Sequence, residues 1–294
     1  MRRTKMTMRR QGATEIDDSL NKAAREAVKA AIEADHAVDP LFRPEVSRLV
    51  SAYASAAKRH GPLIERAIGD ALEAAGCTVF RNLGVPVTQG ALELAESHDY
   101  AMTATRPIRF VDGKIAGFVD IDILAIDEER EVAWALSIKR GGGATETKKR
   151  RAIERDLMAL RLNLGSYLRQ QGYSRVTTAH AFVVDYLGSA GFSKAITLTR
   201  EKIDDVFGLP IMESIDAMTQ AMKAALDAEL ARLLAPVVRG MERPVLPKRP
   251  EALARPTPFG LHAHSRRRRR EGVPEKPLMS GRPFDSLSTE ESEQ

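Results

Sequence analysis

The sequence predicts a mixed α/β protein, with a helix-flanked sheet preceded by a helical segment and followed by a basic tail. Apolar residues recur every three to four positions in several long segments, and short Val/Ile-rich runs alternate with them. The 294-residue chain is 43% hydrophobic, which suffices for one sizeable core. We divide it into a basic disordered arm (1–14), a helical segment (15–60), an α/β core (61–210), a long amphipathic helix (211–241) and a disordered Pro/Arg-rich tail (242–294).

The N-terminal helices are predicted from apolar stripes and from the residues that interrupt them. A stripe at helical spacing marks a helix over 17–37, and two prolines separate it from a second helix over 45–60. Gly61-Pro62 is expected to open a third helix, 63–75, which Gly76 ends as a C-cap.

Strands and helices alternate through the rest of the chain. The β-branched runs are bounded by turn residues, and a glycine-rich segment separates the hairpin from the next helix. The predicted elements are strands at 77–87 and 108–111, a hairpin at 117–141, a helix from 147 to about 171, a buried strand at 179–187 and a helix at 211–241.

The hairpin carries polar side chains on otherwise apolar strands. Asp120 and Asp122 alternate with apolar residues on the first strand, as Ser137 and Lys139 do on the second. Because side chains on a strand point to alternate faces, each pair is expected to share one face. Burying carboxylates and an ammonium in an apolar sheet is unfavourable unless they pair or hold a metal. We infer a functional site here; a salt bridge within the sheet is the alternative.

This arrangement resembles the PD-(D/E)XK nuclease superfamily, in which an Asp on one strand and a Glu/Asp-X-Lys tripeptide on the next bind Mg²⁺. The matching residues are Asp122 and Ser137-Ile138-Lys139, and the upstream helix offers Glu65. The resemblance covers roughly residues 61–188. It implies a restriction-endonuclease-like mixed sheet core and a DNA nuclease, dependent on Mg²⁺ or Mn²⁺, that serves DNA processing, repair or defence.

One residue departs from the family pattern: Ser137 stands where the family has an acid. A hydroxyl is a neutral ligand, whereas Mg²⁺ favours carboxylates and water. In the active interpretation Lys139 orients the attacking water and stabilises developing negative charge. The alternative is a catalytically inactive nuclease-fold protein that binds DNA or acts as a scaffold. The candidates are Asp122, Lys139, Glu65 and Ser137 for catalysis, and Asp122, Asp120, Glu65 and the Ile138 carbonyl for the metal.

The net charge of +5 is concentrated in the two ends of the chain. Residues 1–10 hold five basic side chains and no acid, and residues 241–294 hold eleven basic and eight acidic ones. Basic arms favour polyanions, because each neutralised phosphate releases counterions, so DNA is the expected partner and RNA the alternative. A basic first turn in the 147–171 helix opposes its own dipole, which indicates an external anion or a solvated face. The candidate nucleic-acid contacts are Lys148, Lys149, Arg150, Arg151, Arg266, Arg267, Arg268, Arg269 and Arg270.

Two weaker features suggest further roles. Asn163 and Tyr167 stand one helical turn apart, which is similar to a Gln-x-x-x-Tyr pattern in the nuclease domains of bacterial recombination helicase-nucleases; chance is the alternative. The 211–241 helix suggests a homodimer, and a third hypothesis is an interaction protein whose tails bind RNA or acidic partners.

Several classes of protein are excluded by composition. A single cysteine, Cys77, excludes a disulfide framework and a cysteine-rich zinc site. The longest apolar runs fall short of a membrane span, and no apolar segment follows the basic N-terminus as a secretory signal would require. We therefore expect a cytoplasmic protein with no membrane partner.

Overall fold

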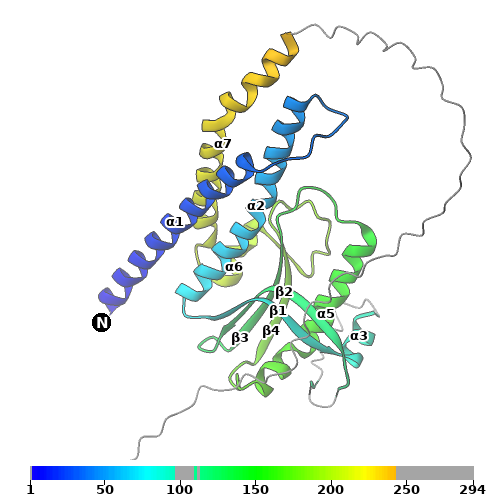
Figure 1. Ribbon diagram of the computed structural model, residues 1–294. Helices are drawn as coiled ribbons and strands as arrows, with labels where there is room; N and C mark the ends of the chain where they lie inside the picture. The colour runs from blue at the N-terminus through cyan, green and yellow to red at the C-terminus, as the bar shows by residue number, and fades with distance from the viewer. Residues whose placement is uncertain (1, 97–108, 111–112, 243–294) are drawn as a thin grey trace, which may run out of the picture. The chain divides into compact units, whose positions relative to one another are not determined.

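The computed structural model describes residues 2–96, 109–110 and 113–242, with only the backbone given for residues 2–15 and for Glu242. Within these residues, five strands form one mixed sheet in chain order, which confirms the predicted α/β architecture (Figure 1). The first three strands are antiparallel neighbours, and the last two add in parallel. The strands are β1 (Thr78–Thr88), β2 (Ile115–Asp127), β3 (Val132–Lys139), β4 (Thr178–Asp185) and β5 (Thr197–Thr199).

Helices cover both faces of this sheet. Three long helices contact one another and, with a short fourth, bury an apolar cluster against one face, which we call the α2-side core. Two other helices bury a second cluster against the opposite face, the α5-side core. The first group is α1 (Arg2–Glu33), α2 (Pro44–Ala74), α6 (Arg200–Phe207) and α7 (Ile211–Glu242); the second is α3 (Gln89–Glu96) and α5 (Thr147–Gln170).

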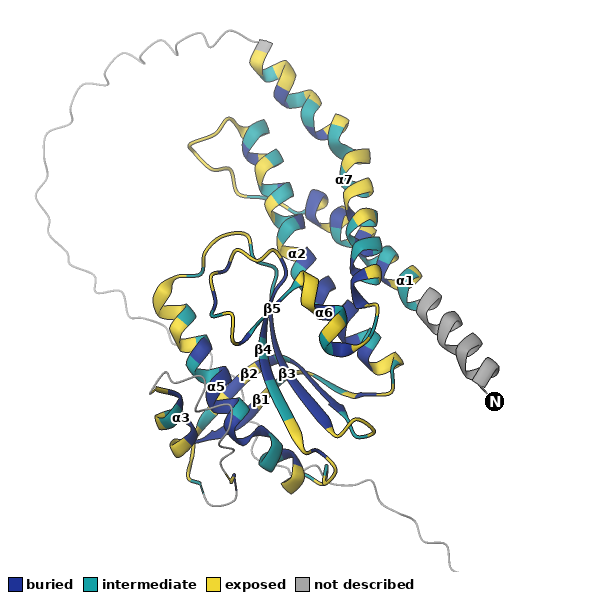
Figure 2. Ribbon diagram, turned by 180° about the vertical axis from the view of Figure 1, so that it is seen from behind, coloured by how far each residue is buried: buried dark blue, intermediate teal, exposed yellow. Residues whose placement is uncertain are grey.

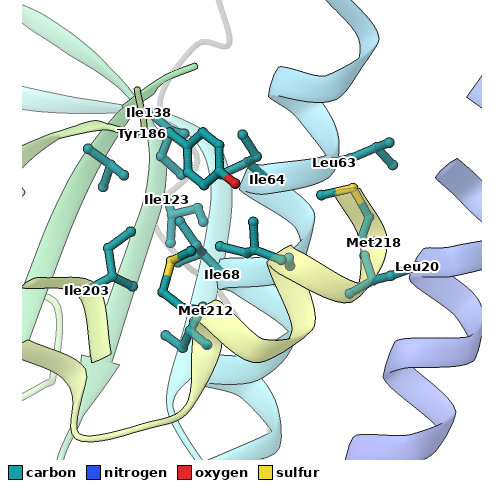
Figure 3. Close-up of a cluster of buried hydrophobic side chains, with 14 of the residues drawn as sticks. Leu20, Leu63, Ile64, Ile68, Ile123, Ile138, Tyr186, Ile203, Met212 and Met218 are labelled. Atoms are coloured by element: carbon teal, nitrogen blue, oxygen red, sulfur yellow. The ribbon is translucent and has the colours of Figure 1, made fainter. Parts of the chain in front are cut away.

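The α2-side core joins the helices to the strands that carry the hairpin motif. Figure 3 shows Ile64 and Ile68 of α2 beside Ile123 of β2 and Ile138 of β3, with α7 closing the cluster. Each of these fully buried aliphatic side chains stabilises the fold by about 1.5–3 kcal/mol. The strand ends that hold the candidate site are therefore fixed against α2.

The central strand β3 is buried on both faces along most of its length (Figure 2), which is typical of a strand with a parallel neighbour. Trp134 is 2% exposed and packs edge-on against Phe207, with ring centroids 5.4 Å apart. The Arg130 guanidinium lies 5.2 Å from the Trp134 ring centroid.

The predicted break at Gly61-Pro62 is wrong: α2 runs without interruption through Pro62. A proline inside a helix removes one backbone hydrogen bond and costs roughly 3 kcal/mol. Here His60, Leu63 and Ile64 are buried on both sides of the proline, so packing of the whole helix against the sheet and α7 offsets the loss.

The ends of the predicted segments also differ from the structure. Residues 2–14, expected as a disordered arm, are helical, because this stretch has no proline and is rich in Arg and Met, which favour helix. Helix α3 was not predicted. Of the expected strand 108–111, Arg109 and Phe110 are described and lie outside any strand. The tail 242–294 lies outside the described residues, apart from the backbone of Glu242.

Of the remaining elements, β1, the β2–β3 hairpin, α5, β4 and α7 start and end within a few residues of their expected bounds, whereas β5 and α6 were not predicted. Much of the apolar face of α7 is buried within the same chain, through Ile211, Ile215, Met218 and Met222. In the described part of the chain, no helix combines the length and apolar character that a membrane crossing requires.

Candidate active site at the separation of two strands

Strands β2 and β3 separate midway along their length. Their pairing begins at Ile123 opposite Leu136 and runs toward the hairpin turn. On the other side of this point β2 remains paired with β1, and β3 remains paired with β4 as far as Lys139. The sheet therefore opens beside Asp122 and Ser137, the first positions at which β2 and β3 no longer pair with each other.

Asp122 bridges this opening. One of its carboxylate oxygens, Oδ2, accepts a short hydrogen bond from the backbone N–H of Ile138. The same oxygen lies 3.8 Å from the Lys139 ammonium. Both side chains are partly exposed, Asp122 by 25% and Lys139 by 38%. The carboxylate and the ammonium predicted to meet across the hairpin do so, at a place that solvent reaches.

An irregularity in β1 lies opposite Asp122. Asn82 has a φ of 53°, a left-handed conformation that asparagine tolerates better than most residues. On β2, Ile121 belongs to the α5-side core, yet Ile123 belongs to the α2-side core. The regular alternation from which a shared face for Asp120 and Asp122 was expected therefore fails at Asp122.

Glu65 reaches the same site from α2. Burial raises the pKa of this carboxyl group, and the nearby charge of Asp122 raises it further, while Lys139 acts in the opposite direction. The two carboxylates therefore repel each other, and the positive charge of Lys139 partly offsets this repulsion. Glu65, Asp122 and Lys139, placed together by sequence reasoning, are brought into one electrostatic group by the fold.

The other predicted site residues have different surroundings. Ser137 is 7% exposed, and Ile138 contributes its N–H to Asp122 and its side chain to the α2-side core. Asp120 is exposed and lies opposite Gly84 on β1. Among the described residues, no three His, Cys, Asp or Glu side chains are grouped as a metal site. Asp120 is thus not gathered as a third acid beside Glu65 and Asp122.

The basic first turn of α5 is accessible. Lys148, Lys149 and Arg151 are exposed, and Arg150 is half-buried, with a guanidinium nitrogen close to Gly191. Within the part of the chain that is described, none of the four forms an ion pair with a carboxylate. The five arginines 266–270 lie outside the described residues.

Asn163 and Tyr167 have structural contacts. In the orientation that satisfies its amide, Asn163 donates to the Ala159 carbonyl at 2.9 Å and accepts from the Thr88 N–H at 3.2 Å. The Tyr167 ring packs edge-on against Phe110, with centroids 5.0 Å apart. These contacts join α5 to the end of β1 and to Phe110.

A buried carboxylate beside the site was missed by sequence reasoning. Asp185 ends β4 in register with Lys139 and is 2% exposed. Its Oδ2 accepts from the Ala190 N–H at 2.8 Å, while Oδ1 has no hydrogen-bond partner among the described atoms. A Cβ on Gly141, whose φ is +69°, would lie 2.6 Å from Oδ1. An acid directly after the apolar run of β4 was the available signal.

A second missed group joins α2, the end of β3 and α7. The Arg140 Nε donates to His60 Nδ1 at 3.1 Å, and His60 Nε2 bonds the Thr219 hydroxyl at 2.9 Å. Thr219 in turn donates to the Ile215 carbonyl at 2.7 Å. Burial, with a smaller effect from Arg140, lowers the pKa of His60 to about 4. At neutral pH this histidine is therefore an uncharged acceptor for Arg140.

Comparison with family models, with curated proteins and with solved structures gave no match for this chain.

Proposed function

We propose that this protein is a Mg²⁺-dependent DNA nuclease built on a restriction-endonuclease-like core. The observation that supports it best is the position of Asp122 at the separation of β2 and β3, bonded to the Ile138 N–H and 3.8 Å from the Lys139 ammonium. A cation and a carboxylate from adjacent strands meet at an accessible opening, and a second carboxylate approaches from α2. This combination suits hydrolysis of a phosphodiester.

The donor set at the opening fits a hard divalent cation that is completed by substrate. Mg²⁺ is commonly held by one or two carboxylates together with waters and substrate phosphates. Asp122 and Glu65 supply two carboxylates. Burial and, secondarily, repulsion from Asp122 raise the pKa of Glu65, and a divalent cation would relieve that repulsion. When bound, the ion supplies positive charge that stabilises the phosphate and favours deprotonation of an attacking water.

The protein's own groups have distinct tasks in this proposal. Asp122 and Glu65 hold the cation, and the Ile138 N–H fixes the orientation of the Asp122 carboxylate. Lys139 lies beside Asp122 and donates to the phosphate or to the attacking water, so that negative charge developing there is stabilised. The exposed first turn of α5 adds positive charge that attracts the DNA backbone.

A catalytically inactive DNA-binding protein is the second candidate, and Ser137 favours it. The residue is nearly buried and neutral, where the resembled family has a charged ligand. With no third acid at the opening among the described residues, affinity for the cation rests on two carboxylates. In that case DNA binds in a salt-dependent manner and is not cut.

Cleavage by variants distinguishes these candidates. Full-length protein is incubated with single-stranded, linear and supercoiled DNA in Mg²⁺, in Mn²⁺ and in EDTA. The wild type should cut only with a divalent cation, and Asp122→Asn should reduce cutting by at least about 100-fold. Asp127→Asn is the matched control, because this acid on the same strand also accepts a backbone N–H and faces an arginine. Binding without cleavage by the wild type would establish the inactive form.

A further inference from the structure

The group formed by Arg140, His60 and Thr219 holds an arginine directly after Lys139. Among the described residues, the guanidinium is anchored only through Nε, at 3.1 Å from His60 Nδ1. His60 is 6% exposed, packs edge-on against Tyr186 and is itself held by Thr219 of α7. Because the histidine is anchored on both sides, the direction of the Arg140 guanidinium is set by buried groups.

The charge of Arg140 is not neutralised by this anchor. Within the described residues, no carboxylate lies within ion-pair distance of Arg140, and its partner is an uncharged imidazole. Two other arginines that contact α2 or α7 do have acid partners: Arg81 contacts Asp70 and Glu73, and Arg200 contacts Asp216. A guanidinium that is oriented but unpaired retains donors and positive charge for an external anion.

The backbone around Arg140 fixes its position relative to Lys139. The Lys139 carbonyl accepts from the Tyr186 N–H and the Arg140 carbonyl from the Leu187 N–H, each at 3.0 Å, so the ladder with the chain after β4 continues past the strand end. The chain then turns at Gly141, where Asp185 occupies the space that a side chain would need. Lys139 and Arg140 are therefore two successive cations on a rigid strand end.

We propose that Arg140 binds a backbone phosphate of the nucleic acid, next to the phosphate that the proposed function places at Asp122 and Lys139. His60 acts as a positioning residue that orients the guanidinium without cancelling its charge. The inference rests on the proposed function for the identity of the ligand. A planar guanidinium whose terminal nitrogens have no partner among the described residues matches the paired oxygens of a phosphate.

The test measures DNA affinity as a function of salt in the Asp122→Asn protein, which separates binding from cleavage. Removing one phosphate contact should lower the slope of log K against log [salt] by about one and weaken binding about fivefold at 0.15 M salt, independent of base sequence. Arg140→Ala should show this loss. Arg140→Lys retains the charge but not the guanidinium plane or the Nε anchor. Its salt slope should therefore stay close to that of the parent, while its DNA affinity should fall.

Arg200→Ala is the matched control, because this arginine bonds the hydroxyl of Tyr186, the residue that packs against His60, but already has Asp216 as its partner. Its salt slope should equal that of the parent, and thermal unfolding confirms that each variant is folded at the assay temperature. An unchanged slope in a folded Arg140→Ala protein overturns the inference and leaves the nuclease proposal standing. A reduced slope in a protein whose wild type never cuts DNA supports Arg140 and overturns the nuclease activity. Absence of DNA binding by the parent overturns both.

Discussion

Asp122 Oδ2 contacts two successive residues of β3, the backbone N–H of Ile138 and the ammonium of Lys139 at 3.8 Å. An ion pair as exposed as this one contributes only about 0–1 kcal/mol to folding. The sheet around it is apolar, and continuing the β2–β3 register by two residue pairs, to Ile121 opposite Ile138, would offer the same N–H a backbone partner. A stabilising salt bridge is therefore a poor explanation for the arrangement, which favours a role in binding an external group.

Two substitutions at position 122 should differ in stability although both abolish the proposed activity. Asp122→Asn retains an oxygen that accepts from the Ile138 N–H, and we expect the free energy of unfolding to change by less than about 1 kcal/mol. Asp122→Ala leaves that partly buried donor without a partner, which should cost about 1–3 kcal/mol. Denaturant unfolding of both variants measures the difference. Equal stabilities would mean that water or a rearranged backbone satisfies the N–H.

Ser137→Glu should increase the affinity of the site for divalent cations. The position is adjacent to the opening, and a third carboxylate near Asp122 and Glu65 adds the charged ligand that the resembled family possesses. Without metal, three acids repel, so the variant should be less stable than the wild type. With millimolar Mn²⁺ its unfolding midpoint should rise more than that of the wild type, since a ligand that binds only the folded state stabilises it.

Ser137→Ala is the control for that experiment, because it removes the hydroxyl and adds no charge. Its unfolding midpoint should respond to Mn²⁺ as the wild type does. Isothermal titration calorimetry gives the metal affinities directly. If Ser137→Glu gains no affinity for Mn²⁺ while remaining folded, the side chain at 137 does not face the same space as Asp122.

Sequence periodicity predicted the main features of the core because the signals were strong and local. The alternation on β3 held, since Leu136 and Ile138 both enter the α2-side core and flank Ser137. The convergence of Asp122, Lys139 and Glu65 was predicted from the order of elements and the family resemblance. The continuous α2 was missed because a proline is a local signal, and the packing that overrides it comes from elements distant in sequence.

Features that depend on register or on distant partners were beyond sequence reasoning. The separation of β2 from β3 at Asp122 and the left-handed Asn82 opposite it leave no periodic trace. His60 and Thr219 are 159 residues apart, so no spacing rule joins them. Asp185 carried a readable signal, a charged residue closing a buried strand, but its contact with the turn at Gly141 required the fold.

Gly141→Ala should destabilise the protein, and Gly143→Ala should not. At 141 the backbone φ is +69°, which costs a side-chain-bearing residue about 1–2 kcal/mol, and the added Cβ would lie 2.6 Å from the buried Asp185 Oδ1. At 143 no atom lies within 4 Å of an added Cβ. We expect a loss of at least about 2 kcal/mol in the first variant and less than about 0.5 kcal/mol in the second, measured by denaturant unfolding. Equal stabilities would show that the loop adjusts freely and that Asp185 does not shape it.

His60 should make folding stability depend on pH between about 4 and 6.5. Burial, and secondarily Arg140, lowers its pKa from 6.5 to about 4 in the folded protein. Between about pH 6.5 and pH 4, His60 is protonated in the unfolded chain but stays neutral in the folded protein. The free energy of unfolding therefore falls as the pH drops. The loss is complete near pH 4 and amounts to at most about 3 kcal/mol. Above pH 6.5 neither state is protonated, and the residue adds no pH dependence.

The contribution is isolated by subtracting the unfolding free energies of His60→Gln from those of the wild type across this range, because carboxylates that titrate nearby cancel in the difference. Glutamine can still accept from the Arg140 Nε, so the contact survives without a titrating group. The difference curve should be flat above pH 6.5 and fall toward pH 4. Arg140→Gln removes the cation beside the imidazole and should raise the pKa of His60 in NMR titration. The pH range over which His60 affects stability should then begin at a higher pH. A flat difference curve down to pH 4 would mean that His60 takes up its proton equally in both states, and that it is not the buried neutral acceptor that holds Arg140.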